Sequence, residues 1–249
     1  MSGPLARLAS VAGRSSVVRD LSDLARPYYR KLDPWTGLSG LDRRLVAYLP
    51  DSPGFFVEAG GNDGLKQSNT YFLESRRGWR GLLVEPVPRL AKRCERNRPR
   101  ARVINAALVP PDIAGRPVSL VDVDLMTVTA SARELTEVQV AHVAAAEKAQ
   151  GIVRQEVLAP GRTLSDCIES AGLPRVDLLS LDVEGFELGV LQGLDLRRHA
   201  PTWALVETQD PDAVSESLGA GYERIGRLSQ HDWLFRCREP RQVRTGAAG

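Results

Sequence analysis

The sequence predicts an α/β protein in which helices pack on both faces of a mostly parallel β-sheet. From Pro53 onward, short apolar runs alternate with stretches of helical character, which is typical of parallel strands joined by crossover helices. The chain has 249 residues, 43% of them hydrophobic, and this is enough for one sizeable core. We therefore expect a single domain over residues 51–238 with additions at its ends.

The predicted elements follow in chain order. Strands are expected in the runs at 54–60, 81–86, 101–109, 152–159, 176–183 and 202–207. Helices are expected at 68–77, 88–97, 163–172 and 185–194. The last two apolar runs, 221–228 and 231–237, alternate in the way of an antiparallel pair.

Three segments lie outside this rhythm. Residues 1–50 space their apolar side chains between arginines and aspartates, which predicts an N-terminal helical extension that packs on the domain or on a second copy of the chain. A lid over the acceptor site and a helix on a membrane surface are the alternatives. An insertion at about 110–160 holds an extra strand within 117–128 and an alanine-rich helix at 131–150. Residues 239–249 have too little apolar content to pack, so we expect a disordered tail.

Composition argues against several classes of partner. A net charge of +2, from 33 basic and 31 acidic residues, gives no overall field that would favour nucleic acid or a membrane. Three widely spaced cysteines without a CxxC pair indicate neither a disulfide framework nor a zinc site. No run approaches the roughly 20 apolar residues of a membrane span. We expect a cytoplasmic protein that binds a small molecule.

Polar residues follow the predicted strands where a ligand would bind. In open parallel sheets, ligands lie beyond the carboxyl ends of the strands. The first strand ends in EAGGNDG, and Glu85 ends the second strand at about the 20-residue interval at which an acid binds ribose hydroxyls. An acid at Glu58 would repel a pyrophosphate and suits a cationic ligand. Structural turn glycines and a solvent-facing Glu85 are the alternative.

The motifs VEAGGNDGLKQSNTYFLE, WRGLLVEP, VINAALV, RTLSDCIESAG and VDLLSLDVEGFELGVLQGL resemble those of the FkbM family of S-adenosylmethionine-dependent methyltransferases. The resemblance runs from about Phe55 to about Glu207. It implies a class I methyltransferase fold, which is a Rossmann-like seven-stranded sheet with an antiparallel final pair. It also implies S-adenosylmethionine as cofactor and, as acceptor, a hydroxyl group of a sugar, glycan, glycolipid or secondary metabolite.

The resemblance also implies a cofactor site. The residues expected to hold the methionine end, the ribose and the adenine are, in that order, Glu58, Gly60, Gly61, Asn62 and Asp63, then Glu85, then Asn105 with Ala106. Ser180 departs from the family, which often has Lys at this position, and this puts the acceptor pocket or its charge in doubt.

Two strand ends suggest the chemistry of transfer. An alcohol is a poor nucleophile at neutral pH, so a base or a metal ion should assist. Asp182 is the first candidate base, and Asp182 with Glu207 on the next strand could share Mg²⁺, which prefers oxygen ligands. Both acids could instead cap helices or position the substrate. His231 is a second candidate base, with a surface turn as its alternative. Acids at 184 and 187 are typical of a helix N-terminus.

Two other functions remain open at this point. A nicotinamide-dependent oxidoreductase is disfavoured by the acid at Glu58 and by the lack of a G-x-G-x-x-G turn. A non-catalytic nucleotide- or RNA-binding module would use the seven basic residues within 89–102, but that run has no interleaved aromatic residues for base stacking. The acids at Asp182 and Glu207 favour catalysis.

Overall fold

The computed structural model describes residues 33–122, 127–129 and 155–240. Its contacts divide the chain into two units, Met1–Trp35 and Thr36–Gly249, and the elements below all lie in the second. The predicted N-terminal extension lies mostly outside the described residues, as do the predicted helix at 131–150 and most of the predicted tail. Of the extension, η1 (Leu38–Gly40) and α3 (Leu41–Val46) are described.

The main sheet has seven strands in the order β10-β11-β9-β8-β1-β2-β3. The strands are β1 (Phe55–Ala59), β2 (Arg80–Val84), β3 (Ala101–Ile104), β8 (Leu178–Leu181), β9 (Trp203–Glu207), β10 (Tyr222–Arg227) and β11 (Asp232–Cys237). Neighbours from β3 through β9 pair in parallel, whereas β11 runs antiparallel to both β9 and β10. This confirms the predicted mostly parallel sheet with an antiparallel final pair.

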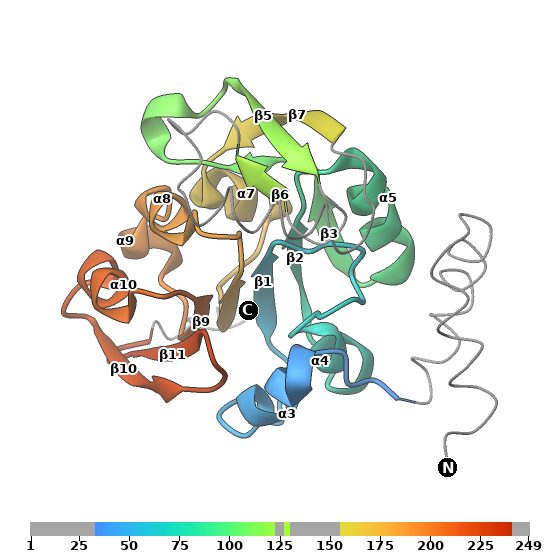
Figure 1. The fold of residues 1–249 in the computed structure, drawn as a ribbon. Coiled ribbons are helices and arrows are strands. Elements are labelled where there is room, and N and C mark those ends of the chain that lie inside the picture. Colours follow the sequence, from blue (N-terminus) through green and yellow to red (C-terminus); the bar gives the residue numbers. More distant parts are fainter. Residues whose placement is uncertain (1–32, 123–126, 130–154, 241–249) are drawn as a thin grey trace, which may run out of the picture. The chain divides into compact units, whose positions relative to one another are not determined.

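Helices cover both faces of this sheet (Figure 1). On one face, α3, α4 (Tyr71–Arg76) and α5 (Pro88–Asn97) pack on sheet residues such as Phe56 and Leu83. On the other, α7 (Leu164–Ala171), α8 (Glu187–Gln192) and α10 (Pro211–Leu218) pack on residues such as Val57 and Leu82. Because successive strand residues point to opposite faces, each apolar run supplies both cores. Helices α9 (Leu196–His199) and α10 were not among the predicted elements.

A second sheet has the strand order β4-β7-β5-β6. It consists of β4 (Ala107–Leu108), β5 (Pro117–Asp122), β6 (Thr127–Thr129) and β7 (Gln155–Arg162), and η2 (Pro111–Ile113) lies between β4 and β5. Ala107, Val109, Val118, Leu120 and Ala159 form a small core of its own. Figure 1 shows this sheet on the side of the main sheet where β1 ends.

The second sheet corrects two predictions. The run 101–109 is not one strand, because β3 ends at Ile104 and the chain enters the second sheet as β4. The run 152–159 was expected in the main sheet, but β7 pairs antiparallel with β5 and parallel with β4. An apolar run indicates a strand without indicating its partner, and here β5 offers β7 a six-residue ladder.

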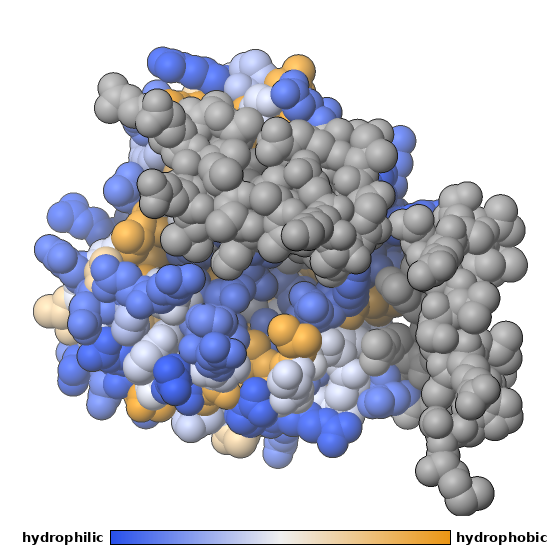
Figure 2. Space-filling model, in the orientation of Figure 1, coloured by the Kyte–Doolittle hydropathy of each residue, from blue (hydrophilic) through white to orange (hydrophobic). Residues whose placement is uncertain are grey.

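The surface of the described residues is largely hydrophilic on the face in Figure 2, with hydrophobic residues in scattered groups. The large hydrophobic side chains that are exposed among them are Leu38, Tyr48, Leu158 and Leu188. Single exposed apolar residues are normal for globular proteins. In the described part of the chain, no helix is long and apolar enough to cross a membrane.

Candidate active site

A pocket opens where the carboxyl ends of the parallel strands meet the second sheet. Its empty volume is about 830 Å³, open space at the mouth included. Its wall comes from the loop after β1, the ends of β2 and β8, and the apolar strands β4 and β5. This is the crevice in which open α/β sheets bind their ligands.

Gly60 lines this pocket and makes the turn that ends β1. Its φ is 87°, and a Cβ there would lie 1.9 Å from the carbonyl oxygen of Asp182. The main-chain N–H groups of Gly60 and Gly61 both donate to the carbonyl of Val84, at 3.0 and 3.1 Å. Gly61 faces Leu83 instead of the pocket, since a Cβ on it would meet that side chain at 3.2 Å. The close approach of the main chain at residue 60 to the carbonyl oxygen of Asp182 therefore requires a glycine at this position.

Acids on the adjoining segments shape the loop. Asn62 lines the pocket with a φ of 46°, and its N–H donates to Oε2 of Glu85 at 2.8 Å. Glu85 Oε1 accepts from the N–H of Val87 at 2.9 Å, so this buried carboxylate ties the β1 loop to the β2 loop. Asp63 Oδ1 accepts from the N–H of Leu65 and of Lys66, at 2.9 and 2.7 Å. The side chains of Glu85 and Asp63 thus order the pocket wall.

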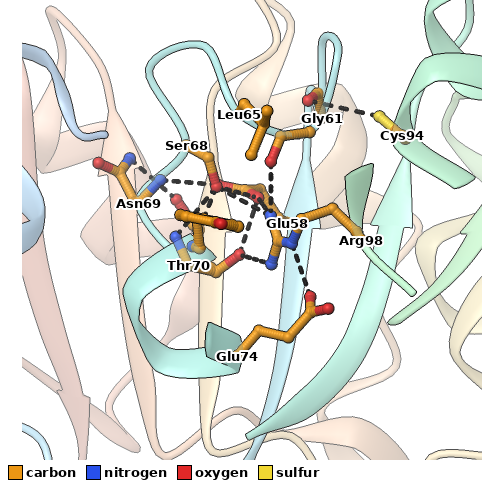
Figure 3. A network of polar contacts seen from close by, with 12 residues as sticks. Glu58, Gly61, Leu65, Ser68, Asn69, Thr70, Glu74, Cys94 and Arg98 are labelled. Atoms are coloured by element: carbon orange, nitrogen blue, oxygen red, sulfur yellow. Dashed lines mark hydrogen bonds and ion pairs between the residues drawn. The ribbon is translucent and has the colours of Figure 1, made fainter. Parts of the chain in front are cut away.

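Glu58 is placed differently from our prediction. Its side chain is buried and is not part of the pocket wall. Its oxygens accept from the Ser68 hydroxyl, the Asn69 N–H, the Thr70 hydroxyl and Arg98 Nη1, at 2.8 to 3.1 Å. Figure 3 shows this carboxylate inside a polar network beneath the loop. The geometry therefore supports an ordering role for Glu58 and does not support direct contact with the methionine end of a cofactor.

Of the two residues expected near the adenine, Ala106 lines the pocket and Asn105 does not. Ala106 lines the pocket beside Val84 and Pro86 and is fully buried. The Asn105 side chain is outside the pocket wall, and its Nδ2 donates to the carbonyls of Glu85 and Pro86, both at 2.8 Å. Ala106 thus contributes to an apolar wall, and Asn105 fixes the chain that leaves β2.

Asp182 lies in the pocket wall directly after β8. Its Oδ1 is buried and has no hydrogen-bond partner among the described residues. The pKa of Asp182 is raised well above its usual value by burial, by a hydrogen bond with the Glu207 carboxyl group, and by the charges of Glu207, Glu184 and Asp232. The structure therefore brings Asp182 and Glu207 together at neighbouring strand ends, as expected, and adds two more acids.

Glu184 was interpreted from sequence as a helix-terminal acid, but it lines the pocket. Its φ of 56° is in the left-handed region, which is uncommon for a residue other than glycine. Oε1 of Glu187, in the first turn of α8, accepts from the N–H groups of Val183 and Gly185 at 3.2 and 2.9 Å and so holds this turn. Burial and the charges of Glu207 and Glu187 raise the pKa of Glu184 to about 7.

The structure gives little support to His231 as the base and none to the predicted Mg²⁺ site. His231 precedes β11, is exposed and does not contribute to the pocket wall, and its N–H donates to the Ser229 hydroxyl at 3.2 Å. In residues 33–122, 127–129 and 155–240, no group of three or more His, Cys, Asp or Glu is arranged to hold a metal ion. The predicted Mg²⁺ at Asp182 and Glu207 is therefore not supported, and we derive no step through a metal.

Sequence reasoning missed Arg98, which we had placed in a basic run on a solvated face. Its guanidinium is fully buried between two carboxylates, with Nε 2.6 Å from Glu74 and Nη1 3.1 Å from Glu58. One signal was available, because Leu90 and Cys94 mark the buried face of α5 and position 98 continues it at the same spacing. Ser180, the departure from the family pattern, is also buried, and its hydroxyl accepts from Asn69 Nδ2 at 3.2 Å.

The sheet order, the glycine turn after β1 and the pocket at the carboxyl edge define a class I methyltransferase fold. The model of the methyltransferase FkbM domain matches residues 58–225. The chain therefore belongs to the FkbM family of S-adenosylmethionine-dependent methyltransferases.

Solved structures with a similar fold have low sequence identity. A point mutant of MtNAS and MtNAS in complex with MTA and tNA each align with a TM-score of 0.42 at 14% identity, over 92% of this chain and 68% of theirs. A TehB-like SAM-dependent methyltransferase from Corynebacterium glutamicum aligns with a TM-score of 0.41 at 13% identity, over 87% of this chain and 97% of its own. No curated protein matches.

Proposed function

We propose that the protein transfers a methyl group from S-adenosylmethionine to a hydroxyl group of a sugar, glycan, glycolipid or secondary metabolite. The observation that carries this proposal is Asp182, an acid of the pocket wall that lies beside Glu207 and whose buried Oδ1 has no hydrogen-bond partner among the described residues. A buried acceptor without a partner is costly and suits a ligand that donates a hydrogen bond.

The pocket residues fit the methyl donor. Val84, Pro86 and Ala106 offer an apolar wall for an adenine, and Gly60 and Asn62 of the β1 loop line the same pocket. Glu85 stands at the end of β2, where we expect the ribose, although its described hydrogen bonds are to the loop backbone. The acid Glu184 in the pocket wall suits a cationic ligand. When bound, S-adenosylmethionine supplies a methyl group on a positively charged sulfur that is a good leaving group.

The acid pair would handle the proton of the acceptor. Burial and a hydrogen bond with Glu207 raise the pKa of Asp182, which makes its carboxylate a stronger proton acceptor. The carboxylate of the pair accepts the hydroxyl proton as the oxygen takes the methyl group. Leu108, Leu120 and Phe186 keep the same pocket partly apolar, which favours the exclusion of water.

The first experiment is isothermal titration calorimetry with S-adenosylmethionine, its demethylated product S-adenosylhomocysteine, and NAD. We expect micromolar binding of the first two and none of NAD. Binding of NAD alone, or of none of the three, would contradict the assignment of the methyl donor.

The second experiment tests the acceptor. Methyl-labelled donor is incubated with a panel of sugars and hydroxylated metabolites, each paired with its amino analogue, with and without a chelator. Transfer to hydroxyl groups that persists with the chelator is the expected result. Transfer to the amino analogues alone would contradict the hydroxyl assignment while leaving the methyl donor intact.

A further inference from the structure

The loop Gly61–Thr70, here called the donor loop, has a conformation that needs support. It supplies Asn62, Lys66, Gln67 and Ser68 to the pocket wall. It contains no helix or strand, and three of its residues have positive φ: Asn62 at 46°, Gly64 at 83° and Gln67 at 58°. Non-glycine residues in this region persist only where the surroundings enforce them.

One face of α5 holds the start of the donor loop. Three successive loop carbonyls, those of Asn62, Asp63 and Gly64, accept hydrogen bonds from three side chains near the end of the helix. The donors are Cys94 Sγ at 2.8 Å, Asn97 Nδ2 at 2.7 Å and Arg98 Nη1 at 3.1 Å. Their spacing of three and four residues places them on one side of a helix. We call these three residues the α5 clamp.

Arg98 also reaches the other end of the donor loop. Nη1 donates to the Ser68 hydroxyl at 3.0 Å and Nη2 donates to the Thr70 hydroxyl at 2.8 Å. Figure 3 shows the guanidinium between Glu58 and Glu74 with these hydroxyls around it. The fit is close, since a Cβ on Gly64 would lie 2.8 Å from Arg98 Cγ. A single side chain therefore ties together both ends of a loop whose middle faces the pocket.

We propose that Arg98 is a positioning residue for the methyl donor, which acts through Ser68 and the carbonyl of Gly64 to hold the donor loop in its binding conformation. The inference rests on the proposed function, because it names the residue outside the pocket that sets donor affinity. A purely structural role predicts a different result, in which loss of Arg98 lowers stability without changing the affinity of the folded protein.

The test compares Arg98→Lys with Glu74→Gln. Lysine keeps the charge but cannot make the forked contacts to Gly64, Ser68 and Thr70. Glu74 bonds Arg98 Nε and the N–H of Arg100 but is not in the pocket wall, so its variant disturbs the same network from the far side. Affinity for S-adenosylhomocysteine is measured by calorimetry at a temperature where both variants are folded. Hydrogen exchange of amides 61–70 is measured in the free proteins.

We expect Arg98→Lys to weaken binding at least tenfold and to speed exchange in the donor loop. Glu74→Gln should change affinity less than twofold, even where it lowers the unfolding temperature as much. Equal affinities for the two variants would overturn the proposal. Where Arg98→Lys fails to fold, Thr70→Val removes the hydroxyl that accepts from Arg98 Nη2 while Arg98 itself stays in place, and unchanged exchange and affinity in that variant would overturn the proposal as well.

The two proposals fail in different ways. If the unaltered protein does not bind S-adenosylhomocysteine, the proposed function is wrong, and the exchange data still report whether Arg98 orders the loop. If the unaltered protein binds and Arg98→Lys binds as tightly, only the positioning role is wrong.

Discussion

Two groups of acids, the buried Glu58 and Glu74 around Arg98 and the half-buried acids around Asp182, have opposite surroundings. Glu58 and Glu74 enclose the guanidinium of Arg98, with donors on both carboxylates. Asp182 has Glu207, Glu184 and Asp232 around it, and its Oδ1 has no donor among the described residues. Position at a strand end therefore does not by itself decide whether an acid is structural or functional. The groups around its side chain decide whether the acid is structural or functional.

The difference has an energetic meaning. A buried ion pair that is fully hydrogen-bonded roughly offsets its desolvation, and removing one partner is strongly destabilising. Like acids crowded in a pocket raise one another's pKa values and make the fold less stable than it would be without them. Such local instability is common at functional sites. Substitutions in the two groups should thus affect stability and activity in opposite ways.

The largest effect is expected from Asp182→Asn. The substitution keeps the shape of the side chain but removes the proton-accepting pair, so methyl transfer should fall by about 10²–10⁴-fold. Donor affinity should stay within about threefold, and the free energy of unfolding should be unchanged or higher. Initial rates with labelled donor, calorimetry and urea unfolding check the three parts. Normal transfer by this variant would remove the acid pair from the mechanism.

Glu58→Gln should act on stability instead. It leaves Arg98 buried beside a neutral amide and disturbs four hydrogen bonds, so we expect a loss of about 3–5 kcal/mol in the free energy of unfolding. Urea denaturation at pH 7 measures it, with Asp182→Asn as the matched control from the other group. A loss below about 1 kcal/mol would mean that the two groups do not differ as described.

The pH dependence of stability sharpens the comparison. Burial and neighbouring charges raise the pKa of Glu184 from 4.5 to about 7, so the folded state binds this proton more tightly than the unfolded state. The bound proton on Glu184 therefore stabilises the folded state fully below about pH 4.5, and this stabilisation is lost as the pH rises through about 7. At pH 8, Glu184→Gln should therefore have a higher free energy of unfolding than the unaltered protein. Between pH 5 and pH 8, the difference in unfolding free energy between the variant and the unaltered protein should shift by about 2 kcal/mol in favour of the variant. A difference of the opposite sign in urea unfolding would refute the raised pKa.

Much of the fold was readable from local patterns. The predicted helix 88–97 has the bounds of α5, and the apolar runs located β1, β2, β8 and β9. Helix α10 was missed although its signals were present, since Asp210 caps it through the N–H of Ala213 and Pro211 follows. The second sheet could not be predicted from the sequence. Its strands β5 and β7 pair although they lie far apart in the chain, and an apolar run does not indicate which strand it will pair with.

The site was predictable to the level of the strand end and no further. The parallel strands β8 and β9 place Asp182 and Glu207 next to each other by topology alone, and their role in catalysis stays a prediction. The direction of each side chain depends on contacts across the fold, so the sequence could not show that Glu58 meets Arg98. The left-handed turn at Glu184 depends in the same way on Glu187 after it.

The smallest effect is expected from His231→Asn, which tests whether the acid group needs a neighbouring base. His231 adjoins Asp232, whose partner across the ladder is Glu207, so its backbone reaches the edge of the acid group. The residue is nevertheless exposed and outside the pocket wall. An imidazole that acts as the base would be essential, and its loss would lower the rate as much as Asp182→Asn does. We expect a change of less than about twofold in the initial rate of labelled methyl transfer at pH 7, because the acid pair can take the proton without it. A loss of about 100-fold would transfer the role of base from the acid pair to His231.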